Sequence, residues 1–138
     1  MTRAATLLAL VLALIAPTAQ AGSERGQAFQ FFRTPSGNIG CVWSSSPAEL
    51  RCDILSGLRP EPRGRCQLDW TGLTMRATGR AHALCAGDTS LNLKSRVLGY
   101  GQTWRRAGFV CLSKRTGLRC TNRSGHGFEL ARQGWRLF

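Results

Sequence analysis

The sequence of 138 residues is poor in carboxylates, lysine and histidine. Seven Asp and Glu residues stand against nineteen Lys and Arg residues, which gives a formal net charge of +12. The chain has no CxxC pair, and neither His82 nor His126 lies at ligand spacing from two cysteines. Zinc sites usually draw their ligands from such pairs. We therefore expect no metal site and no cofactor.

Long apolar runs are also absent, except at the N-terminus. The run at residues 4–16, AATLLALVLALIA, follows Arg3 and precedes AQA at residues 19–21. This pattern is typical of a signal peptide that is cleaved after Ala21. A membrane helix needs about 20 apolar residues, which makes an uncleaved anchor the weaker alternative. We expect one mature domain over residues 22–138 that is secreted, either to the periplasm or to the extracellular space, without a transmembrane segment.

No free thiol is expected, because the six cysteines form an even set in a short exported chain. Six cysteines allow 15 pairings, and the sequence alone does not select one. Spacing favours pairs of sequential neighbours, each closing a loop of about 10–20 residues worth roughly 3 kcal/mol on a chain-entropy model. These pairs are Cys41–Cys52, Cys66–Cys85 and Cys111–Cys120.

After the signal segment, no stretch has a sustained apolar period of 3.6 residues. Residues 73–77 and 81–85 instead alternate apolar and polar side chains, which indicates strands joined by a turn over 77–80. They predict a hairpin over 66–85, with Cys66 and Cys85 near its open ends. Residues 41–52 and 111–120 each run from cysteine to cysteine with turn residues between, as in a cross-linked hairpin. We expect an all-β domain of eight to ten short antiparallel strands, a sandwich or a small barrel, with an exposed loop over 59–65.

Three motifs resemble a family of small exported bacterial proteins that contain a cysteine-rich domain of unknown function. They are FRTPSGNIGC at 32–41, LGYGQTW at 98–104 and GLRCTNRSGHGF at 117–128. The resemblance covers about Phe29 to Phe138, and it implies export and a disulfide-rich β domain. A proline often precedes the Tyr-Gly pair in that family, whereas Gly99 occupies this place here. The resemblance implies no activity and no catalytic residue.

The stretch TNRSGHGFEL at 121–130 contains one of the two histidines. Glycines on both sides of His126 suit a turn that leads into a strand, in which Glu129 faces outward. The alternative is a small hydrolase with His126 as general base and Asp69, Asp88 or Glu129 as its partner. No GxSxG motif supports it, and alternation places His82 on a solvent face.

Basic residues are concentrated in the last third of the chain, where Glu129 is the only acid after residue 101. The positive electrostatic field of such a cluster favours an anionic partner. The sequence contains no nucleic-acid-binding motif. We expect a non-enzymatic binding module for an anionic envelope polymer or a protein partner. Trp104 beside two arginines is either a stacking platform or a core residue. The candidate binding residues are Arg105, Arg106, Lys114, Arg115, Arg123 and His126.

A third possibility is a secreted enzyme inhibitor that presents a disulfide-linked hairpin. Its exposed loop would be SKRTG at 113–117, with Arg115 inserted into the cleft of a target enzyme. The sequence does not distinguish this reading from the binding module, because both use the same basic residues.

Overall fold

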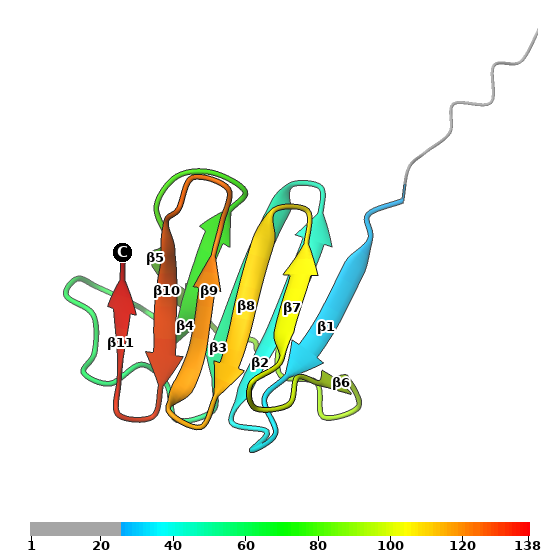
Figure 1. Ribbon diagram of the computed structural model, residues 1–138. Helices are drawn as coiled ribbons and strands as arrows, with labels where there is room; N and C mark the ends of the chain where they lie inside the picture. Colours follow the sequence, from blue (N-terminus) through cyan, green and yellow to red (C-terminus); the bar gives the residue numbers. More distant parts are fainter. Residues whose placement is uncertain (1–25) are drawn as a thin grey trace, which may run out of the picture.

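The computed structural model describes residues 26–138, and the predicted signal peptide lies outside them. The described chain folds into two β-sheets that face each other as a sandwich, with no helix (Figure 1). The expected all-β class is confirmed, and the sandwich applies rather than the barrel. The strands are β1 Phe29–Arg33, β2 Ile39–Ser45, β3 Ala48–Ile54, β4 Asp69–Arg76, β5 His82–Ala86, β6 Arg96–Val97, β7 Thr103–Arg106, β8 Phe109–Lys114, β9 Gly117–Thr121, β10 Gly127–Ala131 and β11 Gly134–Leu137.

The first sheet has six strands in the order β5-β4-β3-β2-β1-β6, and the second has five in the order β11-β10-β9-β8-β7. The eleven strands exceed the expected eight to ten. The excess arises in part from β6, whose two residues are too few to show alternation in the sequence. The hairpin predicted over 66–85 is confirmed as β4 and β5, although β4 begins only at Asp69, and the 59–65 loop is exposed as expected.

The apolar side chains that alternate along the strands form the core between the two sheets. Phe32, Leu73, Phe109 and Phe128 are each at most 1% exposed, and they come from strands of both sheets. Trp104 is also buried, and its ring lies 4.8 Å from that of Phe32 across the gap between β7 and β1. Trp104 is therefore a core residue and not a stacking platform, because β7 turns this side chain toward the other sheet.

Three disulfides join the pairs of sequential neighbours that spacing favours. Cys41 and Cys52 are register partners on β2 and β3, and Cys111 and Cys120 are register partners on β8 and β9. All four of these sulfurs lie in the core. The third bridge, Cys66–Cys85, instead ties the loop before β4 to the edge strand β5.

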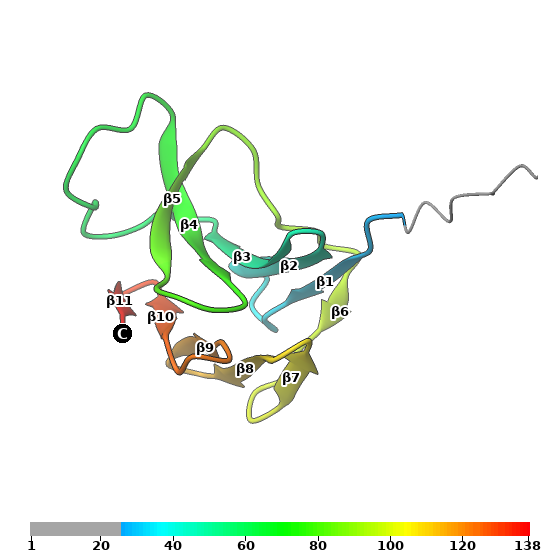
Figure 2. The ribbon, with the colours of Figure 1, turned by 90° about the horizontal axis from the view of Figure 1, so that it is seen from above.

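The connection from β5 to β6 crosses the outer face of the first sheet as a strap, residues 87–95 (Figure 2). It must cross, because β5 and β6 are the two opposite edges of that sheet. Close contact is possible because Gly40 has no side chain. A Cβ atom at this position would lie 2.6 Å from the Cα atom of Leu91.

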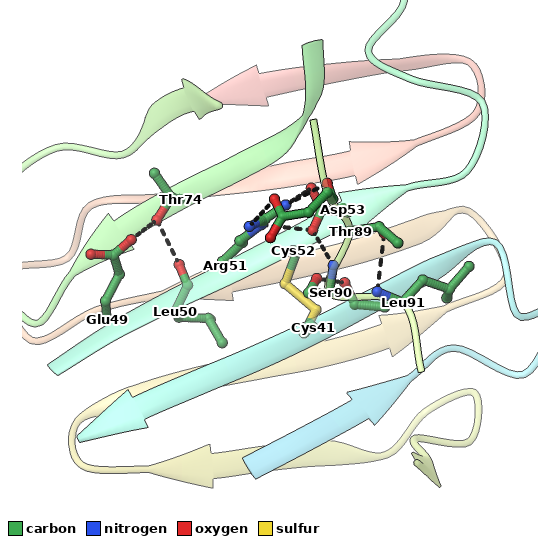
Figure 3. A network of polar contacts seen from close by, with 12 residues as sticks. Cys41, Glu49, Leu50, Arg51, Cys52, Asp53, Thr74, Thr89, Ser90 and Leu91 are labelled. Carbon is green, nitrogen blue, oxygen red and sulfur yellow. Dashed lines mark hydrogen bonds and ion pairs between the residues drawn. A yellow bond between two sulfur atoms is a disulfide. The ribbon is translucent and has the colours of Figure 1, made fainter. Parts of the chain in front are cut away.

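Polar contacts hold the strap around one buried carboxylate (Figure 3). Asp53 is 2% exposed and accepts hydrogen bonds from the Arg51 Nε atom at 2.8 Å and the Ser90 amide at 2.7 Å. Arg51 also donates to the backbone oxygen of Asp88, and the Ser90 hydroxyl donates to the backbone oxygen of Gly40. A buried charge is stable only when it is paired in this way.

Candidate functional site

Four turns meet at one end of the sandwich, the lower end in Figure 1. They join β1 to β2, β6 to β7, β8 to β9, and β10 to β11. A hollow of about 210 Å³ lies among them, and we call it the turn-end pocket. Each of the three sequence motifs singled out above contributes lining residues. The lining consists of Thr34, Ser36, Asn38, Ile39, Tyr100, Lys114, Arg115, Thr116, Gly117, Ala131, Arg132 and Gln133.

The β1–β2 turn forms one wall and is held by its own polar groups. The Gly37 amide donates to the Thr34 carbonyl at 2.9 Å, and Gly37 has a φ of 70°, a backbone conformation that favours glycine. The Thr34 hydroxyl accepts a hydrogen bond from the Ile39 amide at 3.3 Å. The turn therefore presents the side chains of Ser36 and Asn38 to the pocket from a fixed backbone.

The β8–β9 turn forms the opposite wall and lies against the β10–β11 turn. Gly117 has a φ of 138°, and a Cβ atom there would lie 2.6 Å from the Leu130 carbonyl oxygen. Glycine is required for both reasons. Because the two turns are in contact, Arg115 and Arg132 line the same pocket although they are far apart in the sequence.

Tyr100 enters the pocket from the segment between β6 and β7. This segment is anchored to β8, because the Gly101 amide donates to the Ser113 carbonyl at 2.7 Å. The guanidinium carbon of Arg115 lies 4.8 Å from the centre of the Tyr100 ring. Such a cation–π contact contributes about 0.5–1 kcal/mol at an exposed site, and it orients the guanidinium group.

The charges of the turn-end pocket all have one sign. Lys114, Arg115 and Arg132 line it, and no carboxylate does. None of the three forms an ion pair within residues 26–138. By contrast, the described carboxylates other than Asp69 are each paired with an arginine elsewhere on the molecule. The pocket therefore has uncompensated positive charge.

Asn38 adds a neutral polar group to the pocket. It is 8% exposed and lines the pocket. An amide that offers a donor and an acceptor to the pocket is suited to contact a ligand.

The six binding residues suggested by the sequence do not form one surface. Lys114 and Arg115 line the turn-end pocket, whereas Arg123 and His126 lie in the β9–β10 turn at the opposite end of the sandwich (Figure 1). Arg105 and Arg106 are on β7. The guanidinium carbon of Arg106 lies 4.7 Å from the centre of the Trp43 ring.

Arg132 also lines the pocket with Lys114 and Arg115, although it is not among the six candidate binding residues. Its place in ARQG, a short turn sequence like KRTG, was the available signal. The position of this turn cannot be predicted without the strand order, because it is the pairing of β9 with β10 that brings the β8–β9 and β10–β11 turns together.

The β9–β10 turn has a structural role that its sequence already suggested. Asn122 donates its amide hydrogens to the carbonyl oxygens of Arg76 and Gly79, at 3.0 and 2.8 Å. The Ser124 hydroxyl donates to the Asn122 side chain and accepts from the Gly79 amide. These contacts tie the turn to the β4–β5 hairpin of the other sheet.

His126 lies next to backbone rather than next to a catalytic partner. Its Nδ1 atom is 3.3 Å from the Phe138 carbonyl oxygen, and within residues 26–138 it forms no ion pair. Asp88 pairs with Arg51, and Glu129 pairs with Arg119 and Arg136. The described residues therefore do not bring His126 into contact with Asp69, Asp88 or Glu129, as the hydrolase alternative requires. His82 is exposed, as alternation predicts.

Metal ligands are not clustered within residues 26–138, where no group of three or more His, Cys, Asp or Glu residues could hold an ion. The six cysteines are all engaged in disulfides. The same residues contain no helix long and apolar enough to cross a membrane.

Comparison with known proteins gives one match. No curated protein and no solved structure matches the chain. A family model described as "Family of unknown function (DUF6636)" matches residues 6–138. Because the match covers nearly the whole sequence, the chain belongs to this family of unknown function.

Proposed function

We propose that the chain is an exported binding module that holds an anionic group in the turn-end pocket. The observation that carries this proposal is the set of three unpaired cations, Lys114, Arg115 and Arg132, in a pocket lined by no carboxylate. The side-chain amide of Asn38, which also lines the pocket, adds a neutral donor and acceptor. An N-terminal segment with the pattern of a signal peptide, together with three disulfides, supports export.

The chemistry of the pocket favours a phosphate or a carboxylate group. Arginine donates paired hydrogen bonds that match the oxygens of either group, and such charge-assisted bonds are about twice as strong as neutral ones. Lys114 adds a point charge, and the hydroxyl groups of Ser36 and Thr116 add neutral donors. A volume of about 210 Å³ suits the charged part of a ligand.

Calorimetric titration with inorganic phosphate and with glucuronate tests the proposal. The double variant Arg115→Gln/Arg132→Gln is expected to weaken binding by about 100-fold, since each lost charge-assisted hydrogen bond accounts for about tenfold. The matched control is Arg63→Gln/Arg80→Gln, which removes the same charge from exposed positions outside the pocket.

The control variant is expected to bind within about twofold of the parent protein, because exposed charges act only through a screened field. Equal losses in the two variants would show that binding depends on net charge alone. Unchanged binding in the Arg115→Gln/Arg132→Gln variant would also overturn the assignment of the pocket.

A further inference from the structure

A second hollow, of about 420 Å³, lies beside the turn-end pocket on the outer face of β9, β10 and β11. We call it the outer hollow. The two hollows share five lining residues at the β8–β9 and β10–β11 turns, and we call the adjoining pair the groove. The shared residues are Lys114, Thr116, Gly117, Ala131 and Gln133.

The outer hollow exists because small residues stand side by side in neighbouring strands. Ala131 on β10 is the register partner of Gly134 on β11, and Gly117 on β9 lies directly next to Ala131. A Cβ atom at Gly117 would lie 2.9 Å from that of Ala131. This row leaves the backbone uncovered, and larger side chains border it two residues further along each strand.

The border of the outer hollow carries both signs of charge. Glu129 lies between Arg119 and Arg136, with contacts of 2.6 and 3.0 Å to their guanidinium groups. Hydrogen bonds from Arg136 and Arg119 hold the pKa of Glu129 below its ordinary value, which keeps the carboxylate ionised. The three side chains remain 40–62% exposed, so they can also contact a ligand.

The two parts of the groove therefore favour different chemical groups. The turn-end pocket offers only cations and neutral groups, which suits one anionic group. The outer hollow offers alternating donors and acceptors from Arg119, Glu129 and Arg136, and Gln133 offers both. Hydroxyl groups, which donate and accept at once, match such a border. A polyanion with evenly spaced charges matches it less well, because both arginines are already paired with Glu129 and leave one net positive charge at this border.

We propose that the ligand is an acidic saccharide, whose charged unit occupies the turn-end pocket and whose neighbouring neutral unit occupies the outer hollow. This inference rests on the proposed function, because it assumes that the turn-end pocket holds the anionic group. It adds the size of the ligand and the chemical class of the unit beside the charge.

The test compares glucuronate with a disaccharide of glucuronate and N-acetylglucosamine, using calorimetry on the oxidised mature protein. The protein is expected to bind the disaccharide at least about tenfold more tightly, since about two more hydrogen bonds are formed. Gly134→Leu enlarges a residue that lines the outer hollow, and the added Cβ atom meets only the Arg59 carbonyl oxygen, at the ordinary contact distance of 3.8 Å. This variant is expected to bind the disaccharide no more tightly than glucuronate.

The matched control is Gly26→Leu, an exposed position where an added Cβ atom contacts nothing. It should keep the preference for the disaccharide. Equal affinities of the parent protein for the two saccharides, or an unchanged preference in Gly134→Leu, would overturn this inference and leave the anion pocket standing. Tighter binding of a capped tripeptide with one aspartate would overturn it in favour of a peptide ligand. If glucuronate binds equally well to the Arg115→Gln/Arg132→Gln variant, the proposed function itself fails.

Discussion

Replacement of Asp53 by alanine is expected to lower the free energy of unfolding by about 3–5 kcal/mol, the range for removing one partner of a buried ion pair. Arg51, whose side chain is 19% exposed, would lose the carboxylate that contacts its Nε atom at 2.8 Å. The Ser90 amide, at 2.7 Å, would also lose its acceptor. The strap would then keep only the contacts of Arg51 with Asp88, the Ser90–Gly40 hydrogen bond and the packing of Leu91 on Gly40 among those described above.

Asp53→Asn separates the role of charge from that of hydrogen bonding. It retains an acceptor for the Ser90 amide, so its loss should be smaller than that of Asp53→Ala. Asp69→Ala is the control, because Asp69 is exposed and forms no ion pair within residues 26–138. It should change the free energy of unfolding by less than about 0.5 kcal/mol. Denaturant unfolding of the oxidised protein measures the free energy of unfolding of all three variants. An effect of Asp53→Ala as small as that of the control would contradict the role assigned to the strap.

Removal of the Cys41–Cys52 bridge as a pair of alanines is expected to cost more than about 3 kcal/mol. Chain entropy alone gives about that value for a loop closed over 11 residues. Both sulfurs are fully buried in the core, so the alanines also leave a cavity between the sheets. This is a large part of the 5–15 kcal/mol by which a typical domain is stable.

Cys66→Ala/Cys85→Ala is the matched comparison. Its loop is longer, with a separation of 19 residues, but both cysteines are only partly buried. Chain entropy predicts a slightly larger cost for this bridge, whereas packing predicts the larger cost for Cys41–Cys52. The denaturant midpoints of the two variants show whether chain entropy or core packing determines which bridge costs more to remove. A greater loss from the Cys66–Cys85 pair would show that core packing around the buried bridge contributes little.

Local features of this chain can be predicted from its sequence because they depend on near neighbours. The alternation of Leu73 and Met75 with polar residues predicts β4, and the short cysteine separations predict cross-linked hairpins. The turn around Gly125 likewise depends on the glycines beside His126. In each case, the interacting residues lie within about 20 positions of each other.

Other features depend on strand order, which the sequence does not reveal. The strap needs Gly40 on β2 to accept Leu91 from a connection between two sheet edges. The turn-end pocket needs β9 to pair with β10, which brings Arg132 to Arg115. For the same reason, Arg123 could not be separated from Arg115 by charge alone, although the two lie at opposite ends of the sandwich.

The most direct test of the anion pocket is a two-dimensional NMR titration of the isotope-labelled, oxidised protein with glucuronate at physiological salt. We expect the shifted backbone amides to lie in the four turns of one end, over residues 34–38, 99–102, 114–117 and 131–133, and to saturate together. Shifts that centre on Arg105, Arg106 and Arg123 instead would contradict the account. So would shifts that spread over all basic residues and vanish together as the salt concentration rises.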